Sequence, residues 1–95
     1  MSEQQIQRKI IELVEARGGY AVKVITASRS GVPDLLVCFD GYFIGLEVKM
    51  PTTRTNVSPL QKYNLNKIIE CGGKSAVVWS PEQVDELLDL LWNPF

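Results

Sequence analysis

The sequence predicts an α/β domain in which a mixed central sheet is flanked by helices, in the order αβββαβα. Three features predict it: a repeated serine–glutamine pattern at three helix starts, an Asp-Gly turn between two β-rich runs, and a further β-rich run after the second helix. Ninety-five residues, 45% of them apolar, can form one hydrophobic core but not two. We therefore expect a single domain over residues 1–95.

Each predicted helix begins at a serine that is followed three residues later by a glutamine. In this pattern the serine hydroxyl and the glutamine side chain bond the free N–H groups of the first turn. The three serines are Ser2, Ser58 and Ser80, and proline follows the last two, at a position where helices tolerate it. We expect the first helix to end near Arg17, the second near Cys71, and the third to cover 84–91 and fade into the WNPF end.

Four β-rich runs predict the strands, at residues 20–25, 34–39, 42–49 and 74–79. The dipeptide Asp40-Gly41 joins the second run to the third, because both residues tolerate the positive φ angles of a tight hairpin turn. The fourth run follows the second helix in a β-α-β unit. It should therefore lie parallel to a neighbouring strand through a right-handed crossover.

The hairpin brings two carboxylates together. Counting back from the turn places Asp34 opposite Glu47, and alternation places Lys49 on the same face. Like charges directly opposite each other destabilise a sheet, and a bound cation would offset that cost. The alternative is a surface ion-pair cluster in which Lys49 compensates the two acids.

The first helix adds a third acid. Its apolar stripe comprises Ile6, Gln7, Ile10, Leu13 and Val14. Glu3 projects onto the middle of this stripe, whereas Glu12 and Glu15 lie on the opposite face. The helix dipole favours an acid at a helix start, but it does not explain the direction in which Glu3 points. An inward third carboxylate favours a site for a hard cation such as Mg²⁺, which prefers oxygen ligands.

The composition excludes several kinds of site. The chain has no histidine, which removes Ser-His-Asp and Cys-His nucleophiles, HExxH zinc sites and a histidine base. Two cysteines, Cys38 and Cys71, are too few for the usual zinc sites, and we expect both to be reduced and buried. The net charge of −1 is weak evidence against a nucleic-acid partner. Carboxylates, lysine and a hard cation remain as the main catalytic groups.

No apolar run in the sequence is long enough to span a bilayer, and the first residues lack the apolar core of a signal peptide. We therefore expect a cytoplasmic protein with no membrane partner. No GxxxxGK[ST] or GxGxxG motif is present to bind the phosphates of a nucleotide cofactor. We expect no small-molecule cofactor.

Three short motifs resemble a known family. Gly31-Val32-Pro33-Asp34, then Glu47-Val48-Lys49, then Gln61 on the next helix, resemble the motif of the PD-(D/E)xK nucleases. With Glu3 and Gln7 on the first helix, the set is similar to the virus-type replication-repair nuclease domain (VRR-NUC) and to archaeal Holliday-junction resolvases. The likeness covers residues 3–79. It implies a restriction-endonuclease-like fold and metal-dependent hydrolysis of DNA, in the recombination and repair of a bacterial or phage-infected cell.

The resemblance also implies roles for individual residues. Asp34 and Glu47 would bind Mg²⁺ or Mn²⁺, helped by Glu3 and by the backbone carbonyl of Val48. Lys49 would orient the attacking water or stabilise charge on the phosphate. The second role fits better, because neighbouring carboxylates favour the charged form of a lysine, which is a poor base.

Gln61 has two explanations. The family places a glutamine here facing the catalytic site, but the capping pattern that begins at Ser58 explains the same residue without any chemistry. One side chain could serve both purposes only if it swung between two positions.

Polar residues at both ends of the hairpin are candidate DNA contacts, because hydroxyls, amides and basic side chains commonly bind phosphates. They are Arg29, Ser30, Thr53, Arg54, Asn56 and Lys62. We expect a homodimer that cuts branched DNA, in particular four-way junctions. A less selective nicking or flap nuclease is the first alternative, and a non-catalytic nucleic-acid-binding module is the second. Part of the apolar end of the chain, from Leu87 to Phe95, should cover the sheet, and the excess predicts a partner surface; the alternative is that all of it belongs to the chain's own core.

Overall fold

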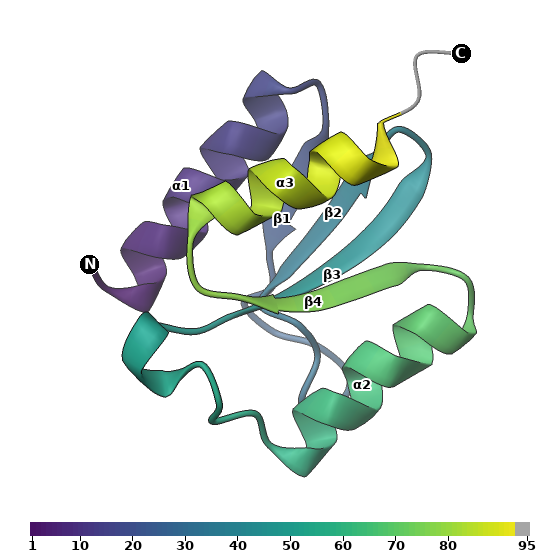
Figure 1. Cartoon of the computed structure of the whole chain (residues 1–95). Helices are drawn as coiled ribbons and strands as arrows, with labels where there is room; N and C mark the ends of the chain where they lie inside the picture. The colour runs from purple at the N-terminus through teal and green to yellow at the C-terminus, as the bar shows by residue number, and fades with distance from the viewer. Residues whose placement is uncertain (93–95) are drawn as a thin grey trace.

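The computed structural model describes residues 1–92 as a four-stranded sheet with helices on both faces (Figure 1). The elements are α1 (Glu3–Ala16), β1 (Tyr20–Lys23), β2 (Leu35–Phe39), β3 (Tyr42–Val48), the short 3₁₀ helix η1 (Pro51–Thr53), α2 (Pro59–Glu70), β4 (Lys74–Val78) and α3 (Pro81–Leu91). The predicted αβββαβα order is confirmed. The helix η1, within the polar connector after β3, was not predicted.

The sheet has the strand order β1-β2-β3-β4, with the first three strands antiparallel and β4 parallel to β3. This confirms the predicted crossover through α2. The turn between β2 and β3 has positive φ at both Asp40 (50°) and Gly41 (82°), as a two-residue hairpin turn requires. Its register pairs Leu36 with Gly45 and Leu35 with Leu46, so the next pair toward the open end is Asp34 and Glu47.

All three predicted helix starts carry a complete capping box. The serine hydroxyl accepts the backbone N–H of the glutamine three residues on, and the glutamine side chain accepts the N–H of the serine. The helices α1 and α2 end at Ala16 and Glu70, one residue before the predicted ends. The first strand is shorter than predicted, because after Lys23 the chain leaves the sheet and runs as an irregular loop to β2.

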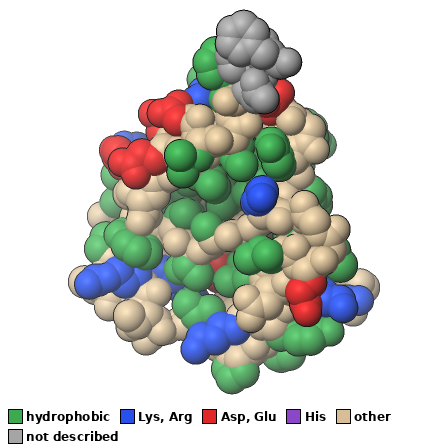
Figure 2. All heavy atoms as spheres, turned by 45° about the vertical axis from the view of Figure 1, so that its right-hand side comes forward, with side chains coloured by type: hydrophobic (Ala, Val, Ile, Leu, Met, Phe, Trp, Pro, Cys, Tyr) green, Lys and Arg blue, Asp and Glu red, His purple; other side chains and the backbone are tan. Residues whose placement is uncertain are grey.

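The two faces of the sheet are covered unequally. α1 and α3 lie on one face, and α2 lies on the other, where it contacts β3 and β4 (Figure 1). On that second face Tyr20, Val22 and Phe43 remain exposed. Figure 2, in which the right-hand side of Figure 1 is turned forward, shows hydrophobic side chains gathered on this side of the molecule, with basic side chains scattered among and around them.

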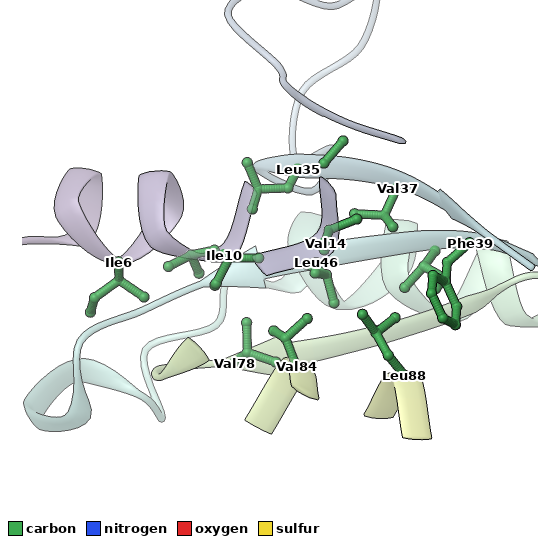
Figure 3. Close-up of a cluster of buried hydrophobic side chains, with 13 residues drawn as sticks. Ile6, Ile10, Val14, Leu35, Val37, Phe39, Leu46, Val78, Val84 and Leu88 are labelled. Carbon is green, nitrogen blue, oxygen red and sulfur yellow. The ribbon is translucent and has the colours of Figure 1, made fainter. Parts of the chain in front are cut away.

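The main core lies between the sheet and the pair α1 and α3 (Figure 3). Its members alternate along the strands and recur at helical spacing: Ile6, Ile10 and Val14 from α1, Ala21 from β1, Leu35, Val37 and Phe39 from β2, Ile44, Leu46 and Val48 from β3, Val78 from β4, and Val84 and Leu88 from α3. Because residues 44, 46 and 48 point into this core, Glu47 points to the opposite face, toward α2.

Both cysteines are free, as predicted, but the prediction that they are buried is wrong. Cys38 lies on the face of β2 that α2 leaves uncovered, and Cys71 follows the last turn of α2; both are exposed. Within residues 1–92, every helix is too short or too polar to cross a membrane.

Candidate functional site

Four of the predicted site residues lie together where the open end of the hairpin meets α2. Asp34 directly precedes β2, Glu47 is the sixth residue of β3, Lys49 follows β3, and Gln61 is in the first turn of α2. The register of the hairpin places Asp34 beside Glu47, and the two-residue period of β3 places Glu47 and Lys49 on one face. That face is the one on which α2 packs.

Hydrogen bonds join three of these side chains in a closed cluster. The Gln61 amide Nε2 donates to Glu47 Oε2 at 3.1 Å, and Lys49 Nζ donates to Gln61 Oε1 at 3.3 Å. Lys49 Nζ also lies 3.6 Å from Glu47 Oε2, and both charged side chains are shielded from solvent. The amide of Gln61 therefore fixes the carboxylate of Glu47 and the ammonium group of Lys49 relative to each other.

Gln61 caps α2 from the same position. Its Oε1 accepts the backbone N–H of Ser58 at 3.0 Å, while its own N–H donates to Ser58 Oγ at 3.1 Å. One oxygen thus accepts from Ser58 and Lys49 together, and Nε2 remains available for Glu47. The prediction that the side chain must swing to serve both purposes is wrong, because a carboxamide carries two acceptor lone pairs and two donor hydrogens.

Asp34 is oriented by the backbone of the neighbouring strand. Its Oδ2 accepts the N–H of Val48 at 2.8 Å, and its own carbonyl accepts the N–H of Val24 at 2.8 Å. The carboxylate is thereby held against the end of β3, one residue from Glu47. This backbone contact was not predicted.

The loop before Asp34 packs closely against α2 and is hydrogen-bonded to it. Gly31 has φ of +81°, and a Cβ atom at this position would lie 2.8 Å from the carbonyl carbon of Leu60. Asn64 Nδ2 donates to the carbonyls of Ser30 (3.1 Å) and Leu60 (2.9 Å). The loop that ends in Asp34 and the helix that carries Gln61 are therefore one connected unit.

Glu47 is the most strongly perturbed acid of the cluster. Only 3% of the residue is exposed, and its Oε1 is buried without a hydrogen-bond partner. Burial, and then the charge and hydrogen bond of Asp34, raise the pKa of Glu47 to about 8, although Lys49 acts in the opposite direction. Two adjacent carboxylates without a cation thus favour a proton on Glu47 at neutral pH.

This perturbation predicts how stability depends on pH in metal-free protein. The folded state holds the Glu47 proton up to about pH 8, whereas the unfolded state releases it near 4.5. The contribution of Glu47 to the free energy of unfolding should therefore be largest below pH 4.5. It should fall by a few kcal/mol as the pH rises to about 8. Urea denaturation in EDTA at pH 5, 6.5 and 8 measures the change. Glu47→Gln should remove this slope, and equal slopes in both proteins would contradict the assignment.

The donor set fits a hard divalent cation. Asp34 and Glu47 offer carboxylate oxygens, and one of these is the buried, unpartnered Oε1 of Glu47. Mg²⁺ commonly binds through one or two carboxylates and completes its shell with water and substrate phosphates. The Val48 carbonyl stays a predicted ligand.

The structure does not bring Glu3 to the other two acids. Within residues 1–92, no group of three or more His, Cys, Asp or Glu side chains is placed to hold a metal. Glu3 is apart from Asp34 and Glu47 because α1 packs on the core face of the sheet, whereas Glu47 lies on the opposite face, toward α2. The arrangement is therefore a two-carboxylate site, and a role for Glu3 stays a prediction.

Gln7 is a second buried polar group with an unpartnered atom. It lies between Ile6 and Ile10 on the inward stripe of α1, with 6% of the residue exposed, and its Oε1 has no hydrogen-bond partner. Buried polar atoms are nearly always bonded, so such an atom marks a place where water or another ligand completes the structure.

The predicted DNA contacts come from the loop before Asp34, the connector after β3 and the first turn of α2, and most are exposed: Arg29, Ser30, Arg54, Asn56 and Lys62. Arg54 is held by a backbone contact to the Pro51 carbonyl and lies 5.8 Å from the ring of Trp79. Thr53 differs from the rest, because it is half-buried and its hydroxyl accepts the N–H of Met50, the residue before η1. This contact with Met50 explains the presence of a threonine at position 53 without a contact to DNA.

Asn64 is the residue that sequence reasoning missed. Its position, three residues after Gln61 and directly before the buried Leu65, places a polar side chain on the inward side of α2. A buried asparagine needs partners for its amide, and that requirement was the available signal for a contact with the Gly31 loop.

Comparison with known proteins gives two informative similarities. No family model and no curated sequence matches the chain. Among solved structures, one described as a VRR_NUC domain shares 34% identity and a TM-score of 0.78, over 95% of this chain and 97% of that one. The structure of Archaeoglobus fulgidus Hjc, described as a Holliday junction resolvase from an archaeal hyperthermophile, shares 19% identity and a TM-score of 0.61, over 81% of this chain and 67% of that one. The second similarity is one of fold, and the first, which extends over nearly the whole of both chains, shows that this protein belongs to the VRR_NUC domain family.

Proposed function

We propose that this protein is a Mg²⁺- or Mn²⁺-dependent endonuclease that hydrolyses phosphodiester bonds in branched DNA, in particular four-way junctions. Its family and the similarity of its fold to a Holliday junction resolvase support a nuclease. The observation that carries the proposal is the cluster of Asp34, Glu47, Lys49 and Gln61, which the fold assembles from three separate segments.

Each member of the cluster has a chemical role. Asp34 and Glu47 would hold the cation, which when bound polarises a phosphoryl oxygen and lowers the pKa of a bound water. Lys49 places a positive charge where a phosphate oxygen gains negative charge during the reaction. Gln61 acts as a positioning residue, because it bonds both Glu47 and Lys49.

The two acids favour catalysis over simple binding. A module that only bound nucleic acid would lose affinity by presenting carboxylates to a phosphate backbone. Here burial, and then the neighbouring charge of Asp34, make the ionised form of Glu47 costly enough to raise its pKa to about 8. A cation that binds both acids and the phosphate removes that cost.

The exposed basic and polar side chains beside the cluster suit the phosphate backbone. Arg29 precedes the Asp34 loop, Arg54 and Asn56 lie in the connector after β3, and Lys62 is next to Gln61. Such groups position a protein on DNA without reading its sequence. We therefore propose selection by DNA shape rather than by base sequence.

Symmetric cleavage of a four-way junction needs two copies of the site, because one cluster cuts one strand. We propose a homodimer with a two-fold axis. The end of α3 is the candidate contact, since Leu90 is 84% exposed and Trp92 is 57% exposed. Phe95, also in the predicted apolar patch, lies outside the described residues.

Cleavage of labelled DNA tests the proposal. Four-way junction and linear duplex are each incubated with Mg²⁺, Mn²⁺ or EDTA. We expect paired nicks on the junction alone, and only with a cation. Cleavage of both substrates would indicate the less selective nuclease. Tight binding without cleavage under every cation would overturn the proposal in favour of a binding module.

A further inference from the structure

A groove runs along the face of the sheet that α2 leaves uncovered. Its larger part, about 620 Å³, lies between the loop after β1 and α2, and a second part of about 310 Å³ continues along α2. The two parts share Phe43, Asn64 and Ile68.

The groove has an apolar floor and a basic edge. Val22, Leu36 and Ile68 contribute to the floor, and Phe43 at its centre is 51% exposed. The charged residues along it are Lys23, Arg29 and Lys67, and no Asp or Glu among residues 1–92 lines either part. The uncompensated cations indicate an anionic partner, and the floor indicates a partner with flat apolar surfaces.

The strand register adds a second aromatic side chain to the same face. Tyr20 pairs with Cys38, and Cys38 pairs with Phe43, so the three side chains form one row across β1, β2 and β3. Tyr20 is 65% exposed. Two strand spacings separate the aromatic residues, which is about 10 Å. Exposed aromatic side chains on a sheet are the usual platform on which unpaired bases stack.

The groove also adjoins the candidate catalytic cluster. Pro33, which lines the groove, directly precedes Asp34, and Asn64, which lines both parts, is one turn along α2 from Gln61. A strand that lay in the groove would therefore lead toward the two carboxylates.

We propose that this groove binds a single-stranded segment of the nucleic-acid substrate, with unpaired bases stacked on Phe43 and Tyr20 and phosphates along Lys23, Arg29 and Lys67. This inference rests on the proposed function for the identity of the partner, and it specifies the substrate further: branched DNA with unpaired nucleotides near the cut. A stacking groove accepts any base, because every base has an aromatic face.

The test uses the full chain and a fluorescein-labelled oligo(dT) in EDTA, so that binding is measured without cleavage. Phe43→Ala should weaken oligo(dT) binding about tenfold, as expected for the loss of one stacked base. Tyr63→Ala is the matched control, because Tyr63 is 56% exposed on α2 but does not line the groove. Lys67→Gln should reduce the salt dependence of log K by about 0.7, whereas Arg8→Gln on the opposite face should not.

Three results would overturn the inference: no oligo(dT) binding by the natural protein, equal binding by the two aromatic variants, or a change of oligomeric state in Phe43→Ala with unchanged oligo(dT) affinity. The last result would assign the groove to a second copy of the chain. Junction cleavage by the natural protein is measured in parallel. If cleavage occurs but the two aromatic variants bind oligo(dT) equally well, the groove inference fails and the proposed nuclease activity stands. If cleavage is absent but Phe43→Ala binds oligo(dT) more weakly, the nuclease proposal fails and the groove inference stands.

Discussion

Glu47→Gln should reduce cleavage of a four-way junction by about 10³-fold or more, while leaving the protein folded and able to bind the junction. The substitution removes one of two carboxylates that would hold the cation, and a bound cation contributes several kcal/mol to stabilising a phosphoryl-transfer transition state. Rates are measured under single-turnover conditions with Mg²⁺ and with Mn²⁺. Junction affinity is measured in EDTA.

Glutamine is the sharper choice at this position, because it separates a catalytic role from a structural one. Its amide has the shape of the carboxyl group, and its oxygen can still accept the bond from Gln61 Nε2. Since Glu47 is buried and its pKa is raised to about 8, removing its charge should leave metal-free stability equal or higher at pH 8. Loss of folding in Glu47→Gln would make the residue structural.

A metal titration completes this test. Calorimetry with Mn²⁺ should detect binding to the natural protein and weaker binding to Glu47→Gln. Glu12→Gln serves as the matched control, since Glu12 is exposed on α1 and should affect neither cleavage nor metal binding. Unchanged cleavage in Glu47→Gln would remove the central assumption of the proposed mechanism.

The hairpin part of the site could be predicted from local sequence, because its geometry depends on the turn. Asp40-Gly41 sets the turn type, the turn sets the register, and the register brings Asp34 to Glu47. Nothing outside residues 34–47 is needed for that step. The predicted register of the hairpin is therefore confirmed for its individual residue pairs.

The parts that involve α1 and α2 depended on packing that no local pattern specifies. The helical period placed Glu3 on the apolar stripe of the first helix, but it did not show that α1 covers the face opposite to Glu47. The capping pattern correctly placed Gln61 at the start of α2, but the approach of that helix to Lys49 depends on the connector between them. For the same reason Asn64 was missed, since its partners lie on a distant loop.

Lys49 distinguishes two mechanisms, and its replacement is expected to have the second largest effect. Lys49→Met removes the charge while keeping a long apolar side chain, and should reduce cleavage by about 10²- to 10³-fold, as expected for losing one group that stabilises transition-state charge. Junction binding should change little, because Lys49 is largely shielded from solvent and bonded within the cluster. Lys9→Met on α1, which is exposed, is the matched control.

Lys49→Arg decides between charge stabilisation and base catalysis. Arginine keeps the positive charge but does not lose its proton in proteins, so it cannot accept one from water. If Lys49 stabilises charge on the phosphate, Lys49→Arg should cleave at least about tenfold faster than Lys49→Met. If Lys49 is the base, the two variants should be equally slow. The position of its ammonium group, bonded to Gln61 Oε1 and 3.6 Å from Glu47 Oε2, favours the first result, because these contacts hold a positive charge beside the acids where a phosphate would lie.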